Sequence, residues 1–428
     1  MNKFLSILFT IALSLPLYAQ EYDQPLWKDF QLDQPEEPDD QPEKPKKPFS
    51  FARQGFEFGI DAGAGFDNDL IKMGDVLKKN IIIDLNQLGG DIRDSGLSLN
   101  TAVIAGLYFN IKNIKIKESV WEFGFFSGVD GNVKFNVPKS LFTLISEGNL
   151  DQRSFDGTIS ASGAVFANAG INSSAQFGKL RVGLKPAVFT PLVFIPKSGI
   201  EYNFVTKDNI TVSTSGEISI YSPFIKNGEF VFDVFGELNF GSDVSVNGEY
   251  ALLSFLDVGG SFSRIPLIPA TVNNRMKLTM PDFNIKIDGE ELMGGNAPDL
   301  PSMEFSEVYD SFEVDVFRPL RFDLYARYKP FSNEILVLRP NVGLSVNIND
   351  KQTYFNAGVK VQLNLLRDLI RLDLGTDYAE AIWTHQLGFA LNLRAFELDV
   401  AAALRSESFI GSFQAQGFGL NLGLRFGW

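Results

Sequence analysis

The residue types that most often carry catalytic or metal chemistry are scarce in this chain. Among its 428 residues cysteine is absent and histidine occurs once, at His385. Without cysteine there is no disulfide framework, no thiol nucleophile and no thiolate metal site. A single histidine excludes multi-histidine zinc sites and leaves any Ser-His mechanism with one candidate base. We therefore expect that the protein is not an enzyme.

The single histidine has a position that argues against catalysis. His385 lies on the apolar side of an alternating segment, the same side as Trp383. We expect it to face lipid within an interfacial belt of aromatic residues, whereas a catalytic histidine would face a cleft. The acidic run Asp288–Glu291 lacks the alternating oxygen ligands of an EF-hand, and Gly63-Ala-Gly65 does not complete a nucleotide-binding glycine fingerprint. We therefore predict no metal and no cofactor.

Charged residues at every second position of apolar segments are the stronger candidates for a functional surface. They form an acidic group in the middle of the chain and a mostly basic group toward its C-terminus. Facing the interior of a barrel, these groups would form opposed walls and set a transverse field across the lumen. The alternative is that they pair across strands and only stabilise the wall. The predicted lumen-lining residues are Glu217, Asp233, Glu237, Asp257, Arg321, Arg327, Lys360, Arg371, Arg394, Arg405 and Arg425.

Large aromatic residues share the polar face with these charges. A wide, water-filled pore has no need for such side chains, so they indicate a narrowed lumen or a site for an apolar ligand. The inward aromatic residues are Tyr108, Phe126, Phe166, Phe189 and Phe235.

The elements that must position these residues are β-strands. Apolar residues occupy every second position from Phe56 to Phe66, with glycine and acidic residues between them. Such alternation indicates a strand with one apolar and one polar face. About sixteen segments of this kind lie between residues 51 and 428. They include 229–240 and 271–287; Pro281 interrupts the latter, and losing it with one neighbour would leave about fourteen.

A transmembrane barrel explains the alternation better than a soluble sandwich does. Many segments reach the roughly 9–11 residues that cross a bilayer at a tilt. Connections tend to alternate in length, as external loops and periplasmic turns do. The long connections are 67–96, 138–155, 191–208 and 288–318, and the short ones are 173–177, 222–228, 330–333 and 366–368. We predict an all-β fold, a transmembrane antiparallel up-and-down β-barrel of about 14–16 strands over residues 51–428.

The N-terminal part of the chain has a different composition. Residues 1–19 have a basic start and an apolar run, which predicts a secretory signal peptide. The alternative, an uncleaved membrane anchor, is disfavoured because the run is short and ends at Pro16. Residues 20–50 are rich in proline and acidic residues, which predicts a disordered periplasmic tail. This tail is either a spacer or a docking segment for a periplasmic partner, with Trp27 and Phe30 as anchors.

The C-terminal end carries a resemblance. Residues 421–428 place a polar residue at Asn421, a glycine at Gly423 and aromatic residues at Phe426 and Trp428. This pattern resembles the carboxy-terminal assembly signal of bacterial outer-membrane β-barrels, which implies recognition by the barrel-assembly machinery. The size and strand number look like those of general porins and of outer-membrane transporters of fatty acids and other hydrophobic compounds. Residues 138–149 also resemble a segment of an uncharacterised outer-membrane barrel family.

Together these features predict a location and a class of function. A net charge of −14 and a pI near 4.7 argue against nucleic-acid binding. We expect a protein of the bacterial outer membrane, in contact with its lipid, with a periplasmic tail and extracellular long loops. The predicted function is a channel or transporter for small or hydrophobic molecules. The alternative is a non-conducting structural or surface-interaction protein, similar to an adhesin.

Overall fold

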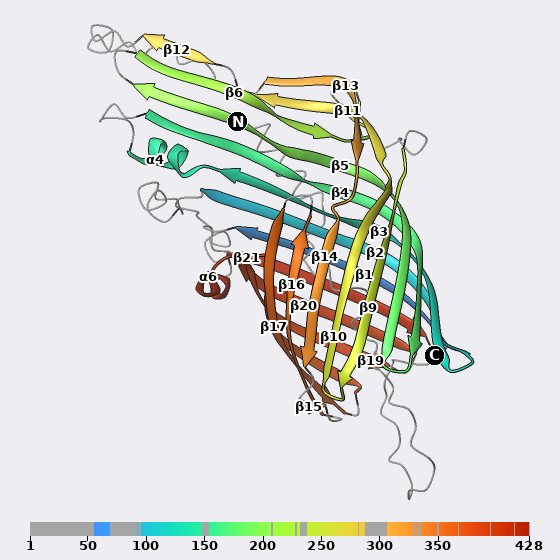
Figure 1. The fold of residues 1–428 in the computed structure, drawn as a ribbon. Helices are drawn as coiled ribbons and strands as arrows, with labels where there is room; N and C mark the ends of the chain where they lie inside the picture. The colour runs from blue at the N-terminus through green and yellow to red at the C-terminus, as the bar shows by residue number, and fades with distance from the viewer. Residues whose placement is uncertain are drawn as a thin grey trace, which may run out of the picture.

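The computed structural model in Figure 1 consists almost entirely of β-strands. It describes residues 55–68, 92, 96–147, 154–206, 209–226, 229–231, 238–280, 282–286, 306–328, 331–332, 335–348, 351–366, 368–393, 395–414 and 416–427. The predicted signal peptide and the predicted tail lie outside these residues.

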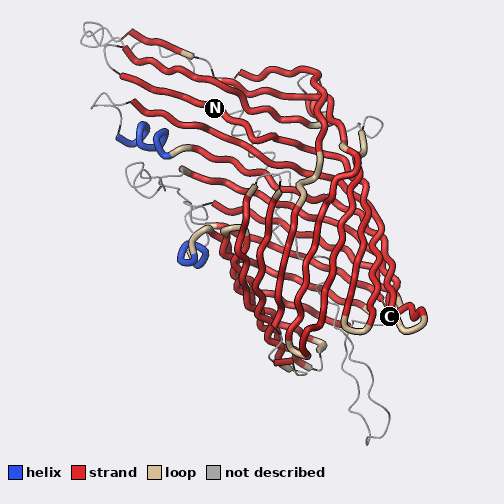
Figure 2. Tube along the Cα trace, in the orientation of Figure 1, coloured by secondary structure: helices blue, strands red, loops and turns tan. Residues whose placement is uncertain are grey.

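Among the described residues, strands account for nearly all of the regular structure, and two short helices complete it. The strands are β1 (Phe56–Asn68), β2 (Leu97–Ile116), β3 (Ser119–Val137), β4 (Ser154–Phe177), β5 (Leu180–Thr206), β6 (Asn209–Tyr221), β7 (Ile225–Lys226), β8 (Glu229–Phe230), β9 (Gly241–Leu253), β10 (Leu256–Ile268), β11 (Ala270–Thr279), β12 (Phe283–Lys286), β13 (Ser306–Val316), β14 (Arg321–Tyr328), β15 (Phe331–Ser332), β16 (Leu336–Asn347), β17 (Gln352–Leu365), β18 (Ile370–Ala379), β19 (Ile382–Leu393), β20 (Phe396–Ser406) and β21 (Gly417–Gly427). The helices are α4 (Lys139–Glu147) and α6 (Phe409–Phe413), which lie at one end of the barrel in Figure 2. Among the described residues, no helix is long and apolar enough to cross a membrane.

The main sheet closes on itself. β1 pairs with β2 on one side and with β21 on the other, and each pairing is antiparallel. The ring runs β1, β2, β3, β4, β5, β9, β10, β14, β16, β17, β18, β19, β20, β21 and back to β1. It is a closed 14-strand antiparallel barrel, so the prediction of an antiparallel barrel of about 14–16 strands is confirmed.

The sheet forks at β5. Its first part, Leu180–Phe189, pairs with β9, whereas Gly199–Thr206 pairs with β6. Between these parts lie Pro191 and Pro196, which cannot donate to a strand ladder. β11 continues β10 beyond the fork, and β6, β11, β12 and β13 pair with one another there. We call these four strands the panel; in Figure 1 they extend past the ends of β14 and β16.

The fork corrects several boundaries predicted from the sequence. The segments 191–208 and 288–318 are not purely loops, because β5 runs to Thr206 and β13 occupies Ser306–Val316. The predicted ring strand 229–240 is described as strand only at Glu229–Phe230, where β8 pairs with β7 in a separate small sheet. The segment 271–287 forms β11 and β12 of the panel. β9, and neither of these two segments, pairs with the first part of β5.

The outer face of the ring is apolar. Leu387 of β19 is 59% exposed, and the next residue in the strand, Gly388, is buried. Exposed apolar side chains at alternate strand positions, facing the same way as Leu387, surround the ring. A soluble fold buries such side chains, so an outer face of this kind suits contact with lipid chains. They include Leu107, Phe125, Ile171, Leu184, Phe262, Leu324, Leu344, Phe355, Leu374, Leu387 and Leu422.

An aromatic cluster lies on this face near α6. The His385 ring stacks on Phe413 with ring centroids 4.0 Å apart, and its Nδ1 lies 3.1 Å from the Thr376 hydroxyl. Trp383 packs edge-on against Phe409. His385 therefore belongs to an aromatic cluster, as the sequence predicts, and faces away from the lumen.

Candidate functional site

The inner face of the ring is lined by ion pairs that connect strands. Arg371 of β18 reaches Glu397 and Asp399 of β20, with nitrogen–oxygen distances of 3.0 Å in both cases. Arg425 of β21 donates to Glu397 at 2.9 Å. Because the strand between β18 and β20 contributes none of these groups, the pairs bridge over β19 on the lumenal side. These ion pairs link β18, β20 and β21.

A second group of ion pairs lines the ring around β14. Arg321 donates to Asp323 at 2.8 Å and pairs with Glu380 at the end of β18. Arg327 pairs with Glu249 of β9, and the Tyr325 hydroxyl donates to the same carboxylate at 3.0 Å.

The predicted lumen-lining residues therefore have mixed surroundings. A carboxylate partner is present for Arg321, Arg327, Arg371, Arg405 and Arg425. These five residues therefore follow the alternative in which charges pair across strands, and they do not form a wall of one charge sign. Arg405 is fully buried on β20, with its Nη2 3.3 Å from Oδ1 of Asp67.

The other predicted residues lie in different parts of the fold. Glu217 is on β6 of the panel, outside the ring, where Lys277 approaches it to 3.5 Å. Asp257 is buried on β10, and Lys360 lies on β17 opposite Gly375 of β18. Asp233, Glu237, Arg394 and Trp428 fall outside the described residues. Asn421, Gly423 and Phe426 lie in β21, where Phe426 pairs with Phe58 of β1.

A cluster that the sequence did not reveal narrows the lumen. Arg318, in the link between β13 and β14, donates two hydrogen bonds to Asp243 of β9. The Nε–Oδ2 and Nη2–Oδ1 distances are 2.7 and 2.9 Å. Arg264 of β10 donates to Asp130 of β3 at 2.7 Å. Since β4, β5 and β9 separate β3 from β10 in the ring, the second pair spans part of the lumen. We call Asp130, Asp243, Arg264, Arg318 and the adjacent Lys185 the constriction.

A β-bulge explains why the alternating pattern of the sequence does not identify Arg264 as an inward-facing residue. The β9–β10 register shifts between Phe262 and Ile265, and Arg264 has a positive φ of 62°. The bulge adds a residue and reverses which side the next side chain faces. Arg264 thus turns inward although it follows the outward Phe262 by an even number of positions. An arginine at an apolar position was the only available signal in the sequence.

Aromatic side chains pack beside the constriction. Phe166 and Phe189 meet edge to face with centroids 5.7 Å apart, and both are buried. Tyr108 and Phe126 form a second buried group with Ala187. Four of the five aromatic residues predicted to point inward are therefore packed in the interior, and Phe235 lies outside the described residues.

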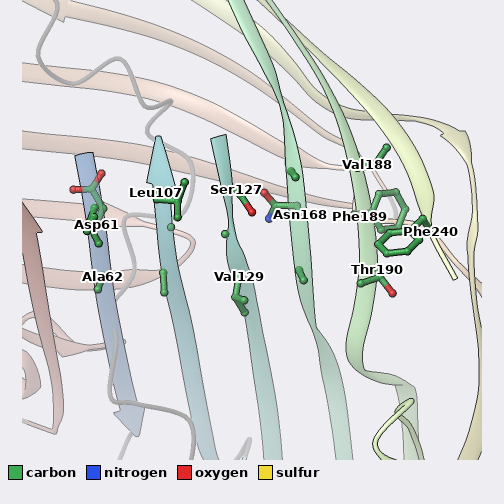
Figure 3. Close-up of a pocket in the computed structure, with 16 residues that line it drawn as sticks. Asp61, Ala62, Leu107, Ser127, Val129, Asn168, Val188, Phe189, Thr190 and Phe240 are labelled. Carbon is green, nitrogen blue, oxygen red and sulfur yellow. The ribbon is translucent and has the colours of Figure 1, made fainter. Parts of the chain in front are cut away.

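A groove marks the outer side of the same wall. It has a volume of about 540 Å³ and crosses β1 to β5 near Phe240 (Figure 3). Its floor consists mainly of small residues such as Ala62, Ala105 and Ala167, which explains the hollow between the larger Leu107 and Val188. Among the described residues, no group of three or more histidine or acidic side chains is placed to hold a metal ion.

Comparisons with known proteins give weak likenesses. No protein-family model matches the chain, and no curated protein matches it by sequence. The P. putida toluene transporter TodX has 12% identity and a TM-score of 0.45, covering 90% of this chain and 93% of that one. The Ralstonia pickettii toluene transporter TbuX has 8% identity and a TM-score of 0.42, covering 89% and 92%. A Pseudomonas aeruginosa FadL homologue has 9% identity and a TM-score of 0.41, covering 87% and 89%. At these values the matches assign neither a family nor a ligand.

Proposed function

We propose that the protein is an outer-membrane channel that passes small or hydrophobic molecules through the lumen of its barrel. The observation that carries this proposal is the combination of a closed ring, an apolar outer face and an inner face of ion pairs interrupted by aromatic groups. A molecule that crosses the barrel must pass the constriction, where Tyr108 and Phe126 offer apolar surface beside fixed charges. Apolar surface flanked by a few polar groups is typical of ligand passages.

The orientation and partners form part of the same proposal. β1 begins and β21 ends at one end of the ring, where the described turns between β2 and β3 and between β4 and β5 are short. Short turns are typical of the periplasmic side, so residues 20–50 would be a periplasmic tail and the long loops at the opposite end would be extracellular. Residues 421–428 would direct the chain to the barrel-assembly machinery, and the tail would be free to meet a periplasmic partner.

Reconstitution tests the proposed channel. The purified full chain is inserted into planar bilayers, and its conductance is compared with uptake of benzyl alcohol by liposomes that contain it. We expect small unitary currents and uptake faster than in protein-free liposomes. Barrels that insert, shown by heat-dependent mobility on gels, but give neither current nor accelerated uptake would contradict the proposal.

One observation favours the second candidate, a non-conducting structural or surface-interaction protein. The Arg264–Asp130 pair and the packed aromatic residues occupy lumenal space. If they close the lumen, the protein acts through its loops. Conductance that appears only after Arg264→Ala and Asp130→Ala are combined would support this candidate.

A further inference from the structure

Lys185 differs from every other charged member of the constriction. Its Nζ lies 4.0 Å from the centroid of the Phe126 ring, and no carboxylate among the described residues pairs with it. The residue is neither fully buried nor exposed, and it shares its side of β5 with the buried Ala187 and Phe189. An ammonium has three donors and no acceptor, and one aromatic face satisfies only part of that capacity.

The neighbouring carboxylates are already engaged by arginines. Asp243 accepts two hydrogen bonds from Arg318. Asp130 accepts from Arg264 at 2.7 Å and from the Asn168 amide at 2.6 Å, and Arg318 Nη1 lies 3.6 Å away. Among these five residues, Arg264 pairs with Asp130 and Arg318 with Asp243, which leaves Lys185 as the third cation beside two carboxylates. In a narrow lumen with low-dielectric walls, one such charge favours anions over cations.

Apolar surface lies immediately beside this charge. Tyr108, Phe126 and Ala187 pack together, and Ala187 follows Lys185 on the same face of β5. The Tyr108 hydroxyl donates to Glu57 at 2.8 Å, which fixes the edge of its ring. A ligand whose charged end met the Lys185 ammonium would therefore have its body against aromatic rings.

We propose that Lys185 anchors the head group of an organic anion with a flat apolar body, bound against Phe126 and Tyr108 in the constriction. This inference rests on the channel proposed above and names the class of molecule that the channel prefers. The anion supplies acceptors that the ammonium lacks, and the rings cover its body. A neutral molecule of the same shape leaves Lys185 without an acceptor, and a cation is repelled.

Two size-matched ions test the proposal, because both keep their charge at neutral pH. Reversal potentials are measured in planar bilayers under gradients of sodium benzenesulfonate and of benzyltrimethylammonium chloride. We expect the full chain to favour benzenesulfonate several-fold, Lys185→Gln to reduce this preference about fivefold, and Lys185→Arg to retain it. Lys179→Gln, at the exposed β4–β5 turn, is the matched control and should leave the preference unchanged. Heat-dependent gel mobility verifies that each variant folds.

The outcomes separate the inference from the proposed channel. Equal permeation of the two ions through the unaltered chain, or an unchanged preference in folded Lys185→Gln, overturns the assignment of Lys185 while the channel stands. Absence of all permeation overturns the channel. In that case calorimetry with benzenesulfonate and the solubilised barrel still decides the site: binding that Lys185→Gln abolishes supports it, and no binding overturns it.

Discussion

At the scale of single residues, the interior depends on paired charges that have little access to water. The Asp243 side chain is 2% exposed and that of Arg318 is 7% exposed, and two hydrogen bonds join them. Taking a charge out of water is costly unless a partner of opposite sign is held in good geometry. Removing one partner of such a pair leaves the other charge buried and uncompensated. Replacing both residues with apolar ones removes the cost of burying a charge.

This asymmetry gives a prediction for Arg318. Arg318→Met should lower the free energy of unfolding by about 3–5 kcal/mol, because Asp243 loses its buried partner. The combination of Arg318→Met with Asp243→Leu should recover most of that loss. Urea unfolding followed by heat-dependent gel mobility measures both variants. A single variant as stable as the unaltered chain would show that water, and not Arg318, solvates Asp243.

At the scale of elements, the fork at β5 needs a close approach of two backbones. A Cβ on Gly241, the first residue of β9, would lie 2.6 Å from the Ala270 backbone nitrogen and 2.6 Å from Phe189 Cζ. A Cβ on Gly248, in the same strand, would meet no heavy atom of a neighbouring strand within 4 Å. β9 can therefore begin beside the β10–β11 junction only if its first residue lacks a side chain.

The two glycines of β9 form a matched pair for mutation. Gly241→Ala should destabilise the barrel by about 1–3 kcal/mol, because the β10–β11 backbone or the buried Phe189 ring must shift. Gly248→Ala should change stability little, since space is available. Thermal unfolding of both variants in detergent tests the contrast. Equal effects of the two substitutions on stability would mean that the backbones at the fork leave enough room for a methyl group at position 241.

The alternation of the strands was readable in the sequence, and the departures from it were not. Segments such as 55–66 and 417–428 became β1 and β21, since a period of two needs only local information. The fork depends on which strand pairs with each half of β5, and pairing is a non-local choice. The sequence predicts a connection over 191–208, whereas β5 continues to Thr206 and changes partner near Pro191 and Pro196. Arg264 was missed because a bulge reverses the parity of β10 at that point.

At the scale of the whole molecule, the two faces of the ring face different solvents. Outward residues such as Leu374 and Leu387 are large, apolar and exposed, and inward residues such as Arg371 are charged and paired. This arrangement is stable only if the outer face meets lipid chains and the inner face meets water or polar side chains. Contact with a membrane thus follows from the ring itself, and a charge should be tolerated on only one of its faces.

Neighbouring positions of β19 test this directly. Leu387, about midway between Trp383 and Leu393, is 59% exposed on the outer face, and Gln386 beside it faces inward. Leu387→Arg places a charge near the bilayer midplane, at a cost of about 2–4 kcal/mol, so the amount of folded barrel in outer membranes should fall sharply. Gln386→Arg introduces the same side chain toward the lumen, where it can remain hydrated, and should affect membrane levels much less. Fractionation combined with heat-dependent gel mobility measures both. Equal loss for the two variants would show that strand disruption, and not contact with lipid, controls assembly.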